Sequence, residues 1–516
     1  MLKRLFVKTA SLGALALLVG AGTIASVGAS AEAKTLTYGS AAGPSTLDPH
    51  MAGATVDYEV TVQIYESLMG LDESYNPKPM LASKVEVSPD AKTYTFTLRK
   101  GVKFQNGKEM TAADVLASFR RYKRVSPNAV ILDGVENYTS TGPYDVTIHL
   151  KQPNAVFLNI IATPLYSLGI LPAEQEEKPG REVEVIGTGP FKLGAWVKDS
   201  HLELVKFDGY VQDEGATARD GLVGRKNVLV DKVTIRFLPE TNVRVSALLA
   251  GDIDIASSLS SDSAKRVAND KKFVLIPSFP NSQGLFVLNS QNGPTANVAI
   301  RQAIEAVVDA EEVVTATGQL YKLNPSMLYP TSPYYDVPSN KGHYSLKDPA
   351  LAKKKLAEAG YKGEKIILQT NANYPFMRDA ILVLSELMKA AGMNADVQVV
   401  DWTTNSNNMQ RGTGNWNVST TGFGPAPLLG PQQWRNQMYN FAQIKNDEVM
   451  DKGFEKFFST LDVEGRKQAW STIQGNVFDK AYFIKIADYG FLSARKAAVS
   501  GMTPWLINRL YGLTVE

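Results

Sequence analysis

The segment LASKVEVSPDAKTYTFTLRKGVKFQNGKEMTAADVLASFR, at residues 81–120, encodes a strand, a turn and a helix in a fixed order. Apolar side chains alternate with threonines over residues 93–98, which predicts a strand with one buried face. An Asn-Gly pair at residues 106–107 predicts a turn. Thr111 stands three residues before Asp114, a spacing typical of the reciprocal cap at a helix start. The segment therefore predicts a chain that mixes α and β structure.

Two shorter motifs precede this segment: LDP at residues 47–49 and IYESLMGLD at residues 64–72. Together with residues 81–120, they resemble the signature of the extracytoplasmic solute-binding proteins of family 5, the oligopeptide, dipeptide and nickel class. Proteins of that family feed ABC importers. The resemblance implies a binding protein and not an enzyme. Such a binding protein captures a small solute and delivers it to a cognate ABC permease in the inner membrane.

Residues 1–31 have the composition of an export signal. Three basic residues within the first eight precede an apolar run at residues 10–27, and the small side chains of residues 29–31 suit a signal peptidase. We expect cleavage after Ala31, with cleavage after Ala33 as the alternative. The other interpretation is an uncleaved membrane anchor, because the apolar run is nearly long enough to span a bilayer.

Charge and cysteine content narrow the partners. Removal of the three basic residues of the signal leaves 54 − 3 = 51 Lys and Arg against 52 Asp and Glu, a net charge near −1. Nucleic acid or an anionic membrane surface would need a concentrated basic excess, so neither is expected as a partner. The chain has no Cys, which excludes a disulfide, a thiol nucleophile and a lipid-modified N-terminus. We therefore expect a free, monomeric protein of the periplasm.

The glycine-rich segment IGTGPFKL at residues 186–193 has two interpretations. It is weakly similar to a phosphate-binding loop, but it lacks the Lys-Ser/Thr ending, and a strand pattern follows where such a loop needs a helix. In family 5 proteins a similar segment marks the return from an inserted domain to the first lobe. Further along, residues 239–250 predict a helix that Gly251 ends.

The second half of the chain continues the alternation. GLFVLN at residues 284–289 predicts a strand. A single helix is predicted to start at Val298 and to end near Gly318. Asp348 and Pro349 predict a helix start, and Gly360 predicts its end.

A strand, a helix and a strand are predicted at residues 366–369, 377–391 and 395–400. This spacing is typical of two parallel strands joined by a helical crossover. Because ligand-binding loops gather where parallel strands end, we expect cargo contacts near these strand ends.

The resemblance implies an α/β fold of the two-lobe periplasmic binding protein type, class II and cluster C, with an extra domain inserted in the first lobe. Two strands at a hinge would join the lobes, and cargo would contact both lobes only when they are shut. The implied division is a signal peptide (1–31), a first lobe (32–62, 186–262 and 484–516), an inserted domain (63–185) and a second lobe (263–483).

Peptide-binding members of family 5 hold the peptide's amino terminus with an acidic residue of the second lobe. The corresponding segment here, NWNVSTTGFGPAPLLGPQQW at residues 415–434, contains no Asp or Glu, and the expected acid is replaced near Pro425 or Ala426. A buried ammonium without a counter-charge is costly. The sequence therefore predicts weaker binding of simple di- and tripeptides than of an uncharged, sugar-like or opine-like solute.

The resemblance and the strand ends together nominate a set of ligand-binding residues. They are Met51, Ala52, Gly53, Ala54 and Thr55 after LDPH, Ser282 and Gln283 before the strand at 284–289, Asn371, Asn373, Tyr374 and Arg378, Trp402, and Thr420, Thr421, Gly422 and Phe423.

Each group has a chemical reason. The small residues of 51–55 let the main chain approach a ligand closely. Asn371, Asn373 and Tyr374 offer hydrogen bonds and a stacking face. Trp402 follows a strand end, with a purely structural role as the alternative. Arg378 is displaced by a few positions from the arginine of dipeptide binders, so it either contacts cargo or lies on the outer face of its helix.

An enzyme is not supported by any motif. The chain shows neither a G-x-S-x-G elbow nor a P-loop, and no catalytic residue, metal ligand or cofactor is expected. The four histidines, His50, His149, His201 and His343, lack metal-binding spacing, and each is expected at the surface or in a turn. Three alternatives remain: a nickel-chelate carrier, a ligand-sensing partner of a membrane receptor, and a periplasmic holdase.

Overall fold

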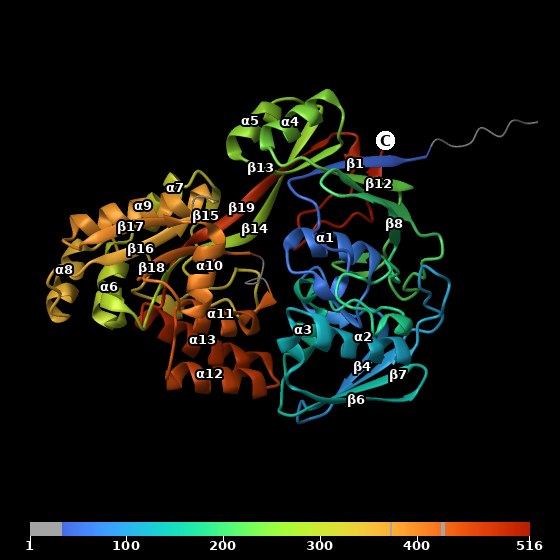
Figure 1. Cartoon of the computed structure of the whole chain (residues 1–516), viewed down its shortest axis with the longest axis horizontal. Coiled ribbons are helices and arrows are strands. Elements are labelled where there is room, and N and C mark those ends of the chain that lie inside the picture. The colour runs from blue at the N-terminus through green and yellow to red at the C-terminus, as the bar shows by residue number, and fades with distance from the viewer. Residues whose placement is uncertain (1–32, 372–373, 425–428) are drawn as a thin grey trace, which may run out of the picture. The chain divides into compact units, whose positions relative to one another are not determined.

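The computed structural model describes residues 33–371, 374–424 and 429–516, so the predicted export signal lies outside the described residues. The main element is a mixed sheet of 11 strands (Figure 1). In spatial order its strands are β17 (Ala395–Val400), β16 (Ile366–Asn371), β18 (Val418–Phe423), β14 (Phe273–Leu288), β19 (Phe483–Lys496), β13 (Ile255–Leu259), β1 (Thr35–Ser40), β12 (Lys232–Phe237), β9 (His201–Lys206) and β8 (Phe191–Val197), and β15 (Leu320–Lys322) pairs with β19 off this path.

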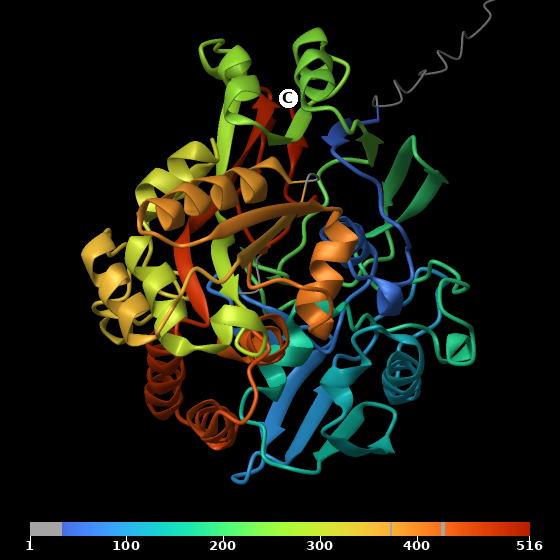
Figure 2. The ribbon, with the colours of Figure 1, turned by 60° about the vertical axis from the view of Figure 1, so that its left-hand side comes forward.

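Strands β14 and β19 connect the two halves of this sheet. They pair antiparallel from Phe273 opposite Lys496 to Val287 opposite Phe483. One end of β19 also pairs with β13, and the other end of β14 pairs with β18. We name β13, β1, β12, β9 and β8 the first half-sheet and β18, β16 and β17 the second half-sheet. Both long strands can be followed between the half-sheets in Figure 2.

The predicted crossover in the second half-sheet is confirmed. Strands β16 and β17 are parallel, with Ile366 opposite Ala395, and α9 (Pro375–Ala390) connects them. Strand β18 lies parallel to β16 on its other side. Alternate side chains of these strands bond to α9 on one face and to α10 (Trp402–Arg411) on the other. The carboxyl ends of the three strands therefore meet at one edge.

The single helix predicted for residues 298–318 is wrong, because the structure has two helices there. They are α6 (Val298–Val307) and α7 (Ala310–Ala316). Asp309 accepts hydrogen bonds from two amides of the next turn, at 3.0 and 3.2 Å, and so starts the second helix. The start of α8 (Pro349–Glu358) is as predicted, since Asp348 caps it in the same way.

A separate antiparallel sheet contains the segment at residues 81–120. Its order is β4 (Ala82–Val87), β5 (Thr93–Leu98), β7 (Asp145–Leu150) and β6 (Val135–Gly142). The predicted alternation in β5 is confirmed, because Tyr94, Phe96 and Leu98 are buried. Helix α2 (Ala112–Val125) begins after Thr111, whose amide donates to Asp114 at 2.8 Å.

A buried ion pair ties the LDP motif to α2. Asp48 accepts two hydrogen bonds from Arg121, at 3.0 and 2.7 Å, and both side chains are buried. His50 lies in the turn η1 (Pro49–Met51), but it is buried and not at the surface. Its ring nitrogens bond to Arg121 and to the carbonyl of Gly169, and burial lowers the pKa of His50 to about 4. His50 thus has the expected position in a turn but not at the surface, because the ion pair and the ring pack together.

The glycines of IGTGPFKL serve close packing. A Cβ at Gly187 would lie 2.0 Å from the carbonyl oxygen of Ile64, and a Cβ at Gly189 would lie 2.7 Å from that of Gln63. Strand β8 follows as predicted, where a phosphate loop would need a helix.

The remaining elements complete the layers around the sheets. The other helices are α1 (Thr55–Ile64), α3 (Phe157–Ala162), α4 (Thr241–Ala250), α5 (Ser261–Ala268), α11 (Trp434–Phe441), α12 (Glu448–Ser459) and α13 (Val463–Asp479). The short strands are β2 (Met69–Leu71), β3 (Pro77–Pro79), β10 (Arg219–Asp220), β11 (Val223–Gly224), β20 (Val499–Ser500) and β21 (Thr514–Val515). Within the described ranges, every helix is too short or too polar to cross a membrane.

We predict that Arg121→Met lowers the free energy of unfolding by about 3–5 kcal/mol, because it leaves the buried Asp48 carboxylate without its counter-charge. Lys123→Met on the same helix is the control: its ion pair with Asp133 is exposed, and its loss should cost less than about 1 kcal/mol. Guanidinium unfolding of both variants measures the difference. Equal losses would contradict a structural role for the Asp48–Arg121 pair.

Candidate functional site

Many of the predicted ligand-binding residues meet at the carboxyl edge of the second half-sheet. Asn371 ends β16 opposite Val400, the last residue of β17. Gln283 of β14 lies opposite Phe423, the last residue of β18. The N-termini of α9 and α10 follow the ends of β16 and β17. This is the edge at which parallel strands place ligand-binding loops.

Four aromatic side chains form a row along this edge, which we call the aromatic row: Trp402, Tyr374, Phe376 and Tyr489. The ring centroids of Tyr374 and Trp402 are 5.2 Å apart at 86°. Phe376 contacts Tyr374 at 6.1 Å and Tyr489 at 5.6 Å, again edge to face. Tyr374 is 41% exposed, so one face of the row is available for stacking. Phe376 was not among the predicted ligand-binding residues, although it lies two residues after Tyr374.

A network of uncharged side chains holds α10 on the sheet. Asn405 Oδ1 accepts from Gln369 Nε2 at 2.9 Å and from Ser419 Oγ at 3.1 Å. Asn408 Nδ2 donates to Gln369 Oε1 at 2.7 Å. Because α10 begins at Trp402, this network also fixes the base of the aromatic row.

Other predicted residues have structural partners at this edge. Asn371 Oδ1 accepts from the amide of Tyr374 at 2.8 Å and so shapes the start of α9. Thr420 donates to a carbonyl of α9 at 3.3 Å, and Thr421 is buried. A Cβ at Gly422 would lie 3.4 Å from the ring of Phe376.

Two predicted residues cannot be fully placed. Asn373 lies outside the described residues, as do Pro425 and Ala426. Phe423 is described only as the last backbone position of β18.

Arg378 has a partner on its own helix. Its Nε and Nη2 atoms donate to Asp379 Oδ1 at 2.9 and 2.8 Å, and the side chain is half-exposed. The guanidinium charge is therefore balanced by an adjacent carboxylate.

Residues 51–55 run from the last residue of η1 to the first residue of α1. The amides of Gly53 and Ala54 each donate to Asp57 Oδ2 at 3.1 Å. Ala52 is buried and Met51 packs against Gly180, while Gly53, Ala54 and Thr55 are exposed. Two of the amides expected to face cargo are thus already hydrogen-bonded.

Gln283 is hydrogen-bonded to a buried ionic group that was not predicted from the sequence. Asp488 Oδ1 accepts from Lys485 Nζ at 2.5 Å and from Gln283 Nε2 at 3.2 Å, and its Oδ2 accepts from Asn324 Nδ2 at 2.8 Å. We call these four residues the Asp488 cluster. Burial raises the pKa of Asp488 and lowers the pKa of Lys485. The signal available in the sequence was a pair of opposite charges within the apolar strand FIKIADYGFL.

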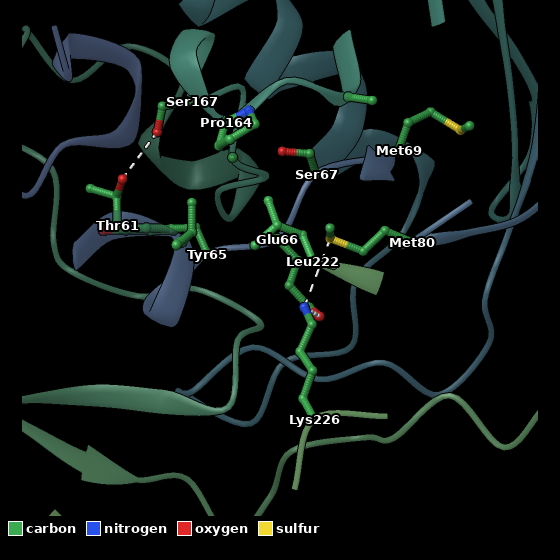
Figure 3. A pocket seen from close by; sticks show the side chains of 13 residues that line it. Thr61, Tyr65, Glu66, Ser67, Met69, Met80, Pro164, Ser167, Leu222 and Lys226 are labelled. Carbon is green, nitrogen blue, oxygen red and sulfur yellow. Dashed lines mark hydrogen bonds and ion pairs between the residues drawn. The ribbon is translucent and has the colours of Figure 1, made fainter. Parts of the chain in front are cut away.

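A third buried ion pair, Glu66–Lys226, lies beside a small cavity (Figure 3). Glu66 Oε1 accepts from Lys226 Nζ at 2.6 Å and from Tyr210 Oη at 3.0 Å, and Thr188 donates to Glu66 Oε2 at 3.1 Å. The cavity, of about 20 Å³, has room for roughly one or two water molecules. It is too small to hold a peptide-sized solute.

Metal binding finds no support in the described ranges 33–371, 374–424 and 429–516, where no three His, Cys, Asp or Glu side chains converge as a metal site. His149, His201 and His343 are partly exposed there, in agreement with the expectation for these three.

Residues 76–444 match the family described as "Bacterial extracellular solute-binding proteins, family 5 Middle". Among curated proteins, the chain is 27% identical over 481 residues to the glutathione-binding protein of Salmonella paratyphi A, covering 90% of each chain.

Two solved structures illustrate the likeness in fold. One is the periplasmic binding protein DppA of Helicobacter pylori in complex with the peptide STSA, with a TM-score of 0.75, 21% identity, and 93% of this chain and 98% of that chain covered. The other is the binding protein AgaA of A. tumefaciens R10 in complex with agropinic acid, with a TM-score of 0.72, 22% identity, and 93% and 99% covered.

We predict that Trp402→Ala weakens solute binding by about 1–3 kcal/mol while the protein stays folded, because it removes one end of the aromatic row. Titration calorimetry with the solute that most raises the melting temperature would measure the change. Trp196→Ala, at a partly exposed tryptophan of the first half-sheet, is the control and should leave affinity unchanged. Unchanged affinity of Trp402→Ala would remove Trp402 from the site.

Proposed function

Because the chain belongs to family 5 of the bacterial extracellular solute-binding proteins, we propose that it captures a small peptide-like solute in the periplasm and delivers it to an ABC permease. It is a solute-binding protein of the ABC transporter class and not an enzyme. We infer that the two half-sheets belong to two lobes, with residues 63–185 inserted in the first, and that the solute is held where the lobes close.

The observation that carries this proposal is the path of β14 and β19. In the pairing from Phe273 opposite Lys496 to Val287 opposite Phe483, both strands cross between the half-sheets. Two strands form a narrow backbone connection, and a hinge made of a few residues is what closure of two lobes around a ligand requires. The predicted ligand-binding residues Ser282 and Gln283 lie on β14 at this crossing.

The chemistry of the carboxyl edge supports an uncharged contact surface. The network beneath α10 is buried and neutral, and the aromatic row offers a stacking face through the partly exposed Tyr374. The neighbouring charges of Asp488 and Arg378 are already balanced by Lys485 and Asp379. Such a surface suits a solute with amide or hydroxyl groups and an apolar or planar part.

The glutathione-binding relative favours a peptide-like solute over a sugar. No acid stands in residues 415–434 to pair with a free peptide ammonium, so we propose a solute that keeps any ammonium in water or has none. In such a solute, the amide groups are the main hydrogen-bonding partners of the protein. The ionic contact that usually anchors a peptide's amino terminus is not made.

Titration calorimetry with Ala-Ala, N-acetyl-Ala-Ala and glutathione tests the proposal, because acetylation replaces the ammonium of the dipeptide with a neutral amide. We expect the acetylated dipeptide to bind at least about ten-fold more tightly than the free dipeptide, since burial of an unpaired ammonium is avoided. Sub-micromolar binding of Ala-Ala together with weaker binding of its acetylated form would contradict the proposal.

A charge-restoring variant sharpens the test. Gly424 directly follows β18, and a Cβ built there meets nothing within 4 Å among the described residues. Gly424→Asp should therefore strengthen binding of the free dipeptide relative to the acetylated one, with Gly424→Asn as the neutral control. An identical change in both variants would show that charge at this position does not reach the solute.

A further inference from the structure

The pairing of β14 with β19 is interrupted twice near the crossing. Ser278 lies opposite Phe491 and Ser282 opposite Tyr489, so the register shifts between these two pairs. It shifts again after Gly284, which lies opposite Ala487, because Leu285 lies opposite Lys485. We call residues 278–285 of β14 and 485–491 of β19 the hinge segment.

Between the two shifts, only a short stretch of paired backbone remains, and Gln283 lies opposite Asp488 at its centre. Irregular registers bend strands and weaken the local ladder. Without further support, this stretch could slip to another pairing, which would turn side chains to the opposite face. Side-chain interactions are therefore needed to specify the register of β14 against β19 in the hinge segment.

The Asp488 cluster supplies that specification. Its carboxylate receives side-chain hydrogen bonds from three directions: Lys485 on its own strand, Gln283 on β14, and Asn324, which follows β15. Lys485 Nζ also donates to the carbonyl of Ala487 at 3.1 Å, across the second shift. The bond from Gln283 is the one that crosses from β14 to β19, so it is made only when Gln283 lies opposite Asp488.

The cluster is buried, with every member at most 3% exposed. Buried charges are costly unless they are paired and hydrogen-bonded, so a slipped register would cost the buried Asp488 carboxylate its bond from Gln283. Buried polar groups of this kind discriminate between alternative packings more than they add net stability.

We propose that the Asp488 cluster is a register lock for the hinge segment, in which Asp488, Lys485 and Asn324 position Gln283 at the solute site. The role of this lock in solute capture rests on the proposed function. Its structural part, the fixed register of the hinge segment, does not depend on what the protein binds.

The chain offers a matched control in the Glu66–Lys226 pair (Figure 3). That carboxylate is equally buried, pairs with one lysine, and accepts two more bonds from the uncharged side chains of Tyr210 and Thr188. It lies away from β14 and β19, so its loss reports the general cost of breaking a buried pair.

Hydrogen exchange of the solute-free, full-length mature protein tests the lock by comparing Asp488→Asn with Glu66→Gln. Both variants should lower the unfolding midpoint, because each leaves a buried lysine unpaired. Only Asp488→Asn should accelerate exchange in peptides covering the hinge segment, by at least about ten-fold, as expected for loss of one or more charge-assisted bonds. Equal acceleration of the hinge segment in both variants, or none in Asp488→Asn, would overturn the proposal.

Two further variants keep the test decisive. Gln283→Met leaves the ion pair in place but removes the bond between Asp488 and β14, so it should also accelerate exchange in the hinge segment. It therefore tests the lock even if Asp488→Asn does not fold. The double variant Lys485→Met/Asp488→Leu removes both charges, so it should regain the unfolding midpoint while the hinge segment still exchanges quickly. Full protection of the hinge segment in the double variant would overturn the lock. Because no solute is present, these results stand apart from any failure of the calorimetric test of function.

Discussion

The antiparallel pairing of β14 with β19 is the constraint on which the rest of the structure depends. Each half-sheet buries its own apolar clusters, one around Leu36 and Val233 and others around Phe286 and Trp416. The two long strands are shared between them. Because backbone pairing between the half-sheets runs through these two strands, one half can rotate against the other when the strands bend, and the rotation would part Val156 of residues 63–185 from the cluster around Trp416. This is the physical basis for the proposed hinge.

Buried ion pairs fix the conformation of segments whose backbone hydrogen bonding is irregular. The Asp48–Arg121 pair holds a turn against α2, and the Lys485–Asp488 pair lies where the strand register shifts. Such pairs add little net stability, because desolvation offsets most of their attraction. Their value is selective: an alternative packing would leave each charge without a partner. The molecule thus uses charge inside the protein to specify geometry, while the network that holds α10 on the second half-sheet is built from neutral groups.

The local patterns in the sequence predicted much of the fold. Alternation identified β5, the caps at Thr111 and Asp348 located two helix starts, and spacing predicted the parallel pair of β16 and β17. Two features were missed, one with a local cause and one with a tertiary cause. The break at Asp309 depends on one side chain that caps a new helix, and the burial of His50 depends on Arg121, which is distant in the sequence.

The candidate site was predictable to the extent that strand ends locate it. Trp402 and Tyr374 were nominated from their positions, and the structure brings their rings together. Phe376 and Asp488 were not, because their roles depend on neighbours from other strands that sequence order does not reveal. Residues 51–55 and Arg378 show the opposite case, in which a plausible position carries groups that already have partners.

The central claim is that two half-sheets move about two strands when a solute binds, and a distance measurement tests it most directly. The chain has no Cys, so cysteines introduced at the exposed Val197 of β8 and Val399 of β17 would carry the only spin labels. Pulsed electron resonance would record the distance distribution with and without a saturating concentration of the solute that binds most tightly in calorimetry. The account predicts a shift to a different and narrower distribution on binding. The same distribution in both states, with binding confirmed in the labelled protein, would contradict it.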